Sequence, residues 1–370
     1  MSELSTCHVG SGQVMTVTGP IPAEAMGITL PHEHILNDCR CWWHRPNEPE
    51  RQHLATEPVD GDIAVEGLVL AGPQWADRLK DLLSALSQSE RACLFAVRLA
   101  DDQALPMPAD TLLDRSRTDW FPDFLSHGQM KPHFQPIVDL TNGEVYGREA
   151  LMRGKLGAVE LRGGELLAAA EAHDALFSFD YRARTAALEV GLPLLPDGEV
   201  LFVNLDPRAV LDVEGSLRTT WPAVGRLGAD PSRICLELVK PERCADRDML
   251  GELVAAHRKR GARVALDDMS GGAESLLFLE QLRPDVVKID NALTAGIQHS
   301  PARRRLVAAL VDCAHEHGCK VVAEGVERVD EFRAMADLGV DLGQGFYFGQ
   351  PTEKPMAVDT RLIRPRAELV

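Results

Sequence analysis

The stretch "VALDDMSGG" (264–272) ends an apolar run with two adjacent aspartates, Asp267 and Asp268, and follows them with a glycine pair. A short apolar run of this kind is typical of a buried strand that ends in a loop. Burying one carboxylate beside another is costly unless a cation lies between them. The stretch therefore predicts a cation site at the end of a strand.

From about residue 131 onward, strand-like runs of this kind alternate with helical segments. The strand-like runs are "HFQPIVDL" (133–140), "EVYGREALM" (144–152), "VLFVNLDP" (200–207), "RICLELV" (233–239), "RVALDD" (263–268), "DVVKID" (285–290), "KVVAEGVE" (320–327) and "GQGFYFGQP" (343–351). The helical segments include 164–191, 246–261 and 301–318, and the last has apolar residues spaced as on one helix face. Repeated strand–helix units imply a parallel sheet, and their number predicts an α/β fold with a closed, TIM-type (β/α)8 barrel.

Polar residues fall at or near the carboxyl ends of these runs. They are Glu149, Asn204, Glu237, Asp267, Asp268, Lys288, Glu324 and Gln344. In a β/α barrel the carboxyl ends of the strands meet at one mouth. One such residue alone is more often a strand end that reaches solvent, but so many in register predict a single polar cluster.

The composition narrows the class of protein. Hydrophobic residues make up 45% and charged residues 26% of the 370 residues, which is the balance of a globular protein. The formal net charge of −17 offers no basic field for polymeric nucleic acid. The eight cysteines form no CxxC pair, no apolar stretch is long enough to span a membrane, and the N-terminus lacks a signal-peptide pattern. We expect a cytoplasmic protein with reduced thiols.

The polar cluster suits a particular chemistry. Its carboxylates and one amide oxygen are the hard donors that Mg²⁺ or Mn²⁺ prefers. An aspartate pair such as Asp267 and Asp268 can flank two ions, an arrangement used to hydrolyse phosphodiesters. Lys288 would orient the attacking hydroxide or offset the charge on the phosphate, and Glu324 would accept a proton or complete the second ion's ligands. The sequence does not decide between the two roles of Lys288 or between the two roles of Glu324.

Seven motifs in order resemble the EAL-domain family over about residues 128–355. They are "GREALMRG" (147–154), "FVNLDP" (202–207), "LELV" (236–239), "ALDD" (265–268), "VVKID" (286–290), "VVAEGVE" (321–327) and "GQGFYFGQP" (343–351). The resemblance implies a modified β/α barrel that hydrolyses cyclic di-GMP to linear pGpG. It also implies a two-metal site for Mg²⁺ or Mn²⁺ and, as is frequent in the family, a homodimer.

The resemblance carries the family's site onto this chain position by position. The residues that look like ligands of the first metal are Glu149, Asn204, Glu237 and Asp267, and Asp268 resembles the ligand of the second. The residues that resemble the water-positioning lysine, the proposed base and a supporting glutamine are Lys288, Glu324 and Gln344. The residues that resemble the dinucleotide contacts are Gln135 and Arg153, and an arginine fork suits a phosphate.

The loop after the aspartate pair departs from the family's pattern DDFGxGYSSL, because "DDMSGGAESL" (267–276) stands there. Lys240 also replaces the glutamate that usually anchors this loop. Two accounts remain open. Lys240 could pair with Glu274 and anchor the loop with reversed charges, or the loop could be loosely held, with a weak second metal.

The N-terminal part poses a separate question. Residues 14–56 resemble the opening of phosphotriesterase-like amidohydrolases, with His32 and His34 at the family's His-x-His metal motif. No following repeats supply the remaining ligands, so an appended segment is favoured over a hydrolase or a weak metal site near Cys39, Cys41 and His44. We expect an N-terminal segment (1–70), a helical linker region (71–127), the EAL barrel (128–355) and a tail (356–370). The leucines at 79, 82, 83 and 86 are spaced as on one helix face and favour core packing over a partner surface.

Three functions compete at this point. The first is a cyclic di-GMP phosphodiesterase, which the intact inner residues favour. The second is a catalytically impaired barrel that serves as a cyclic di-GMP receptor or a protein-interaction module, which the altered loop favours. The third, an amidohydrolase, rests on His32 and His34 alone.

Overall fold

The computed structural model describes residues 14–18, 51–55, 66–70, 74–92, 94–98, 107–244 and 246–359. The chain divides into two compact units, Met1–Phe121 and Pro122–Val370. His32, His34, Cys39, Cys41 and His44 lie outside the described residues, so the resemblance to amidohydrolases is not shown. Among the helices of the described residues, none is both long and apolar enough to cross a membrane.

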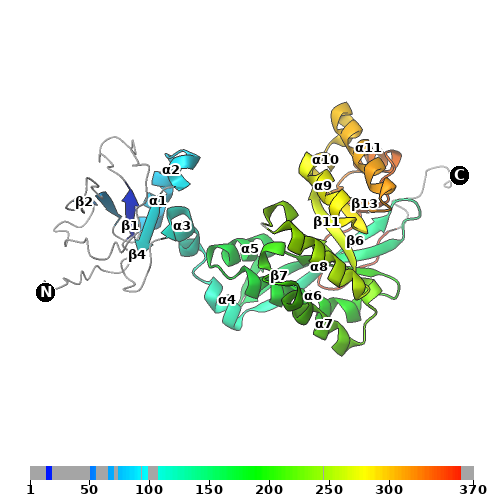
Figure 1. The fold of residues 1–370 in the computed structure, drawn as a ribbon, viewed down its shortest axis with the longest axis horizontal. Helices are drawn as coiled ribbons and strands as arrows, with labels where there is room; N and C mark the ends of the chain where they lie inside the picture. The colour runs from blue at the N-terminus through cyan, green and yellow to red at the C-terminus, as the bar shows by residue number, and fades with distance from the viewer. Residues whose placement is uncertain are drawn as a thin grey trace. The chain divides into compact units, whose positions relative to one another are not determined.

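The first unit contains an antiparallel sheet in the order β2-β3-β1-β4-β5. Its strands are β1 (Val14–Thr18), β2 (Arg51–Ala55), β3 (Glu66–Leu70), β4 (Phe95–Arg98) and β5 (Met107–Pro108), and its helices are α1 (Trp75–Ser84), α2 (Gln88–Ala92) and α3 (Ala109–Arg117). The leucine stripe of residues 79–86 is buried against α3 and β4, which confirms the expectation of core packing. Helices α1 and α3 therefore share a core with β4, beside which Figure 1 draws them.

The second unit is built around a closed barrel (Figure 1). Its strands are β6 (Gln129–Asp139), β7 (Val145–Leu156), β8 (Val159–Arg162), β9 (Val200–Leu205), β10 (Ile234–Leu238), β11 (Arg263–Met269), β12 (Val286–Ile289), β13 (Lys320–Ala323) and β14 (Leu342–Gln344). They follow the order β6-β14-β13-β12-β11-β10-β9-β7-β8, and β6 also pairs with β7. This second pairing closes the barrel and leaves β8 as an extra strand at the edge of β7, so the barrel prediction is confirmed.

Within the closed barrel, one strand departs from the parallel arrangement that the strand–helix repeats imply. β6 runs antiparallel to both β7 and β14. Only a short turn that includes Gly143, with φ 80°, joins β6 to β7, and so short a link makes a hairpin because a parallel crossover needs a dozen or more residues. The barrel is therefore a modified (β/α)8 barrel.

Helices surround these strands. They are α4 (Phe121–His127), α5 (Gly163–Ala172), α6 (Leu176–Leu194), α7 (Val213–Leu227), α8 (Arg247–Lys259), α9 (Ala273–Leu282), α10 (Asn291–Thr294), α11 (Pro301–Glu316) and α12 (Val329–Asp337), with short 3-10 turns that include η2 (Pro207–Ala209), η4 (Pro241–Arg243) and η5 (Ile297–His299). Local chemistry sets their limits. Asp246 accepts a hydrogen bond from the Met249 amide at the start of α8, and Gly228 in the left-handed conformation ends α7.

The inside of the barrel explains how the polar residues come together. An apolar layer of Ile137, Val200, Phe202, Cys235, Ala265, Val286, Val322 and Leu342 fills the interior. Alternate residues of a strand point the same way, so the residue two positions toward the mouth also faces inward. In β9 to β14 that position holds, in chain order, Asn204, Glu237, Asp267, Lys288, Glu324 and Gln344. The strand period thus lifts one polar layer directly above one apolar layer.

Candidate functional site

The Lys288 side chain lies at the centre of the polar layer. Its Nζ is 2.7 Å from Glu324 Oε1 and 3.0 Å from both Glu149 Oε2 and Glu237 Oε1, and it is 3.4 Å from Asp267 Oδ1. The lysine side chain is only 1% exposed. Five strands or strand ends of the barrel therefore deliver one buried ammonium and four carboxylates to one point.

Two side-chain amides also hold the Glu149 carboxylate in place. Gln344 donates to Glu149 Oε2 at 2.7 Å, and Asn204 donates to Glu149 Oε1 at 3.2 Å. Gln344 also donates to Gln135 Oε1 at 3.1 Å, and Gln135 donates to the Gly349 carbonyl at 3.1 Å. A chain of amides thus ties this carboxylate to the segment after β14.

The two glutamates beside Lys288 differ in their pKa. Burial alone would raise the pKa of Glu149, but the Lys288 charge and hydrogen bonds from Gln344, Lys288 and Asn204 outweigh it, and the pKa is lowered. Burial raises the pKa of Glu237 well above its usual range, and the Glu149 charge adds to this rise against the attraction of Lys288. Glu149 is therefore held as an anion, whereas Glu237 binds a proton readily.

The remaining groups follow the same competition between burial and charge. Burial raises the pKa of Asp267 against the opposing Lys288 charge. Burial raises the pKa of Glu324 to about 8, again against Lys288. Burial alone would lower the pKa of Lys288, but the four carboxylates raise it well above its usual range. The lysine therefore stays charged, and it does not balance the whole acidic cluster.

Several oxygens of the cluster are suited to an additional cation. Both carboxylate oxygens of Glu237 and Asp267 Oδ1 are buried and have no hydrogen-bond partner among the residues that the structure describes. Lys288 lies within ion-pair distance of Glu237 Oε1 and Asp267 Oδ1, yet its contacts there lack hydrogen-bond geometry. One oxygen each of Asp267, Asp268 and Glu324 lies within 4.8 Å of the others. Buried carboxylate oxygens without donors fit a hard divalent ion.

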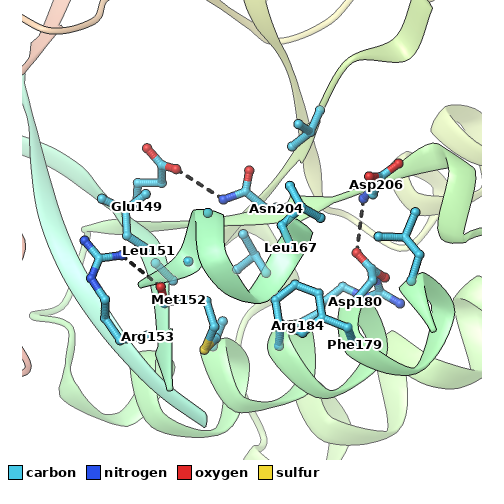
Figure 2. Close-up of a pocket in the computed structure, with 18 residues that line it drawn as sticks. Glu149, Leu151, Met152, Arg153, Leu167, Phe179, Asp180, Arg184, Asn204 and Asp206 are labelled. Atoms are coloured by element: carbon cyan, nitrogen blue, oxygen red, sulfur yellow. Dashed lines mark hydrogen bonds and ion pairs between the residues drawn. The ribbon is translucent and has the colours of Figure 1, made fainter. Parts of the chain in front are cut away.

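A pocket of about 300 Å³ opens beside Glu149 and Asn204. Figure 2 shows Arg153 near Glu149 and, farther along, Asp180 and Arg184 on the helix below. Arg153 donates to the Met152 carbonyl at 2.8 Å, and apolar side chains including Leu167 and Phe179 complete the wall. The acidic centre therefore borders a largely apolar pocket with a cation at its rim.

The chain matches the protein-family model described as "EAL domain" over residues 118–351, which is more than half of its length. The chain belongs to the EAL-domain family. Its barrel resembles that of a standalone EAL protein from Vibrio cholerae O395 in its c-di-GMP-bound form, with 27% identity, a TM-score of 0.59, and coverage of 65% of this chain and 99% of that one.

Two curated relatives are named for cyclic di-GMP. The cyclic di-GMP phosphodiesterase NbdA of Pseudomonas aeruginosa is 27% identical over 347 residues, which cover 91% of this chain and 43% of NbdA. The probable cyclic di-GMP phosphodiesterase PdeB of Escherichia coli is 26% identical over 247 residues, which cover 63% of this chain and 44% of PdeB. The chain spans less than half the length of these curated relatives.

The EAL barrel places the sequence-predicted residues in three groups. Glu149, Asn204, Glu237, Asp267, Lys288, Glu324 and Gln344 form the polar layer around Lys288. Asp268 lies exposed just outside it, and Arg153 lines the pocket. Gln135 is buried behind Gln344 and is not among the pocket-lining residues. The Glu274 side chain lies outside the described side chains, so its pairing with Lys240 stays a prediction.

Sequence reasoning missed one polar group of the EAL pocket. Arg184 forms an ion pair with Asp180, and the Asp206 amide donates to Asp180 Oδ1 at 3.1 Å. Arg184 also donates to Thr220 Oγ1 at 3.1 Å, and both charged side chains are buried. Opposite charges four residues apart usually mark an exposed helix face. The one signal available was Asp206, which directly follows β9, the strand that carries Asn204.

Proposed function

We propose that this protein hydrolyses cyclic di-GMP to linear pGpG with Mg²⁺ or Mn²⁺ as cofactor. The observation that carries the proposal is the buried Lys288 ammonium among four carboxylates, with carboxylate oxygens left over for a cation. Relatives named as cyclic di-GMP phosphodiesterases support the choice of substrate. The combination suits hydrolysis of a phosphodiester better than any chemistry that lacks a hard cation.

The proposed roles follow from the donor set. Glu149, Asn204, Glu237 and Asp267 would hold the first ion, and Asp268 the second. Bound ions would make water more acidic and offset the charge on the phosphate. Lys288 holds a fixed positive charge where the phosphate charge grows, which favours the transition state. Glu324 Oε1 lies 2.7 Å from Lys288 Nζ and accepts the proton that the attacking water loses. The Glu324 pKa of about 8 suits a base near neutral pH.

The proposed substrate position is the pocket beside Glu149. Arg153 at its rim can fork onto a phosphate, and the apolar wall that includes Leu167 and Phe179 can pack against a base. Gln135 acts on the substrate in this proposal through Gln344 and Glu149, because its side chain is already bonded to Gln344 and Gly349. A homodimer and a cytoplasmic location remain parts of the proposal.

A second function has one specific observation in its favour. Asp268, the proposed ligand of the second ion, is exposed and stands at the start of the altered loop, with Lys240 nearby where the family resemblance expects a carboxylate. A weakly held second ion would leave a barrel that binds cyclic di-GMP and turns it over slowly. Such a protein would work as a receptor for the dinucleotide.

One experiment separates the two functions. Purified full-length protein is incubated with cyclic di-GMP and Mn²⁺, and pGpG is measured by chromatography alongside the Glu149→Ala variant. The phosphodiesterase proposal expects pGpG from the wild type and none from the variant. Binding of cyclic di-GMP in a calorimeter without any pGpG would favour the receptor, and neither binding nor turnover would contradict both functions.

A further inference from the structure

Lys240 occupies an unusual backbone position at the mouth of the barrel. It follows β10, which carries Glu237, and precedes Pro241, where η4 begins. Its φ of 50° and ψ of 55° place a non-glycine residue in the left-handed region. That conformation costs a residue with a Cβ about 1–2 kcal/mol. The fold thus holds a lysine at this point in spite of local strain.

Lys240 and Asp268 both lie just beyond the last register pair of two neighbouring strands. β10 and β11 are parallel and adjacent, and Leu238 is the register partner of Leu266. Lys240 comes two residues after Leu238, and Asp268 comes two residues after Leu266. The turn η4, which Lys240 precedes, also contacts α9, the helix that follows the Asp268 loop. Adjacent strands lie about 4.8 Å apart where they pair. Lys240 and Asp268 therefore belong to neighbouring segments at the mouth, and the Lys240 charge acts on Asp268.

The charges around Asp268 show which cations act on its carboxylate. Partial burial of the Asp268 carboxylate, with the charges of Asp267 and Asp290, raises its pKa, and the charges of Lys288 and Lys240 oppose the rise. Lys288 is already surrounded by four other carboxylates. Among the side chains that the structure describes, none forms an ion pair within 4.0 Å or a hydrogen bond with the Lys240 ammonium. Of the two lysines whose charge acts on Asp268, Lys240 is the one that no described carboxylate already pairs with.

We propose that Lys240 is a tethered cation that competes with a divalent ion for Asp268 and so weakens the outer of the two metal positions. The inner position, formed by Glu149, Asn204, Glu237 and Asp267, is centred on Lys288, which already supplies its positive charge, and keeps its affinity. The inference rests on the two-ion site of the proposed function. It identifies Lys240 as a positioning residue that sets how many ions the mouth holds at a given concentration.

Binding of Mn²⁺ alone to the full chain tests this inference without any turnover. Equilibrium dialysis with detection of unbound Mn²⁺ should resolve one tighter and one weaker ion in the wild type. In Lys240→Gln the weaker affinity should rise about tenfold or more, because a unit charge next to the ligand has been removed. The tighter affinity should not change. Lys240→Asn, which suits the left-handed backbone better, should give the same result.

Matched variants separate charge from other effects. Lys240→Arg keeps the charge and should behave as the wild type. Lys259→Gln removes an exposed lysine at the end of α8, away from the mouth, and should also behave as the wild type. Asp268→Asn should abolish binding of the weaker Mn²⁺ ion. Lys240→Gln should then cause no further change in Mn²⁺ binding.

Two results would overturn the inference. One is that both neutral variants leave the weaker affinity unchanged. The other is that their effect persists in the Asp268→Asn background, which would place it elsewhere. Failure of the proposed function is a different outcome, because a chain that produces no pGpG still reports these affinities. Conversely, active enzyme with unchanged Mn²⁺ binding in Lys240→Gln would contradict only the role of Lys240.

Discussion

Lys288 Nζ donates to Glu149 Oε2 at 3.0 Å, although 139 residues separate the two in the chain. Lys288 comes from β12 and Glu149 from β7, so the bond crosses the interior of the barrel. Breaking a buried pair leaves an uncompensated charge in a medium that solvates it poorly. The same contact therefore contributes to the stability of the fold and to the electrostatics of the site.

Removing the Lys288 charge should destabilise the protein and make it more dependent on metal. Lys288→Met leaves four carboxylates without their common cation, so the free energy of unfolding should fall by about 3 kcal/mol in chelator. Excess Mn²⁺ should stabilise this variant more than the wild type, because the ion then neutralises the cluster alone. Urea unfolding with EDTA and with Mn²⁺ measures both effects. Lys259→Met, at an exposed position, should change stability by less than about 0.5 kcal/mol. Equal stabilisation of the wild type and Lys288→Met by Mn²⁺ would contradict the prediction.

Much of the site could be predicted from the sequence because strand alternation is local. Residues such as Glu237 and Lys288 follow an apolar residue by two positions, and a barrel brings all such positions to one layer. The central place of Lys288 could not be predicted, since it depends on distances across the barrel. The turn near Gly143 was a readable sign of the reversed β6.

Other features depend on packing that one sequence does not display. The ion pair of Asp180 and Arg184 has the spacing of a surface pair, and only the burial of that part of α6 makes it a pocket wall. Gln135 matches a motif by position, but its amide is used by Gln344 and Gly349. Motif matching gives residue positions, whereas hydrogen bonds decide which groups remain available to a ligand.

His257 is a buried histidine outside the acidic cluster, and it should make the free energy of unfolding depend on pH. Burial, aided by the charges of Arg184 and Arg260, lowers the pKa of His257 to about 4 from an ordinary value of 6.5. Above pH 6.5 the histidine is neutral in the folded and unfolded states and contributes no slope. Between pH 6.5 and 4 only the unfolded state binds the proton. The contribution of His257 to the free energy of unfolding should therefore fall by about 1.4 kcal/mol for each unit by which the pH is lowered.

The His257→Gln variant isolates this contribution from that of the carboxylates. The glutamine side chain is not ionisable, so the variant should be less stable at pH 7.5 but lose stability less steeply toward pH 4.5. Ser216 Oγ lies 3.1 Å from His257 Nε2, and a glutamine retains a polar group toward it. Urea midpoints of the two proteins across this pH range provide the comparison. Parallel curves would show that His257 is not held neutral in the fold.

Gly325 should be far less tolerant of a side chain than another glycine with the same backbone angle. Gly325, with φ 63°, follows Glu324, and a Cβ there would overlap the Asn291 side chain. Gly296, with φ 67°, has no atom within 4 Å of such a Cβ. Gly296→Ala should therefore cost only the backbone strain of about 1–2 kcal/mol. Gly325→Ala should cost more and reduce turnover of cyclic di-GMP, because Glu324 must shift.

Relief by a second change would identify the overlap as the cause. Asn291→Gly removes the atoms that a Cβ at position 325 would meet, so it should recover part of the stability and activity of Gly325→Ala. It should not improve Gly296→Ala. Thermal unfolding and pGpG production measure the two effects. If Gly325→Ala and Gly296→Ala behave alike, the close approach of Asn291 does not position Glu324.

Helix α4 should be required for a stable barrel, which places the start of the folding unit before the boundary of residue 128 expected from the sequence. Phe124 of α4 is fully buried, and its ring lies where a Cβ on Gly154 of β7 would project. Arg182 of α6 donates to the Leu125 carbonyl, again in α4. A fragment of residues 118–359 should thus unfold at a clearly higher temperature than one of residues 128–359.

In the full chain, Phe124→Ala should lower the free energy of unfolding by about 3–5 kcal/mol, the usual loss for a buried phenylalanine. Leu125→Ala, which keeps the carbonyl that Arg182 uses, should cost less, since Leu125 is only half-buried. Equal melting temperatures for the two fragments would show that α4 is dispensable and that the barrel folds from residue 128.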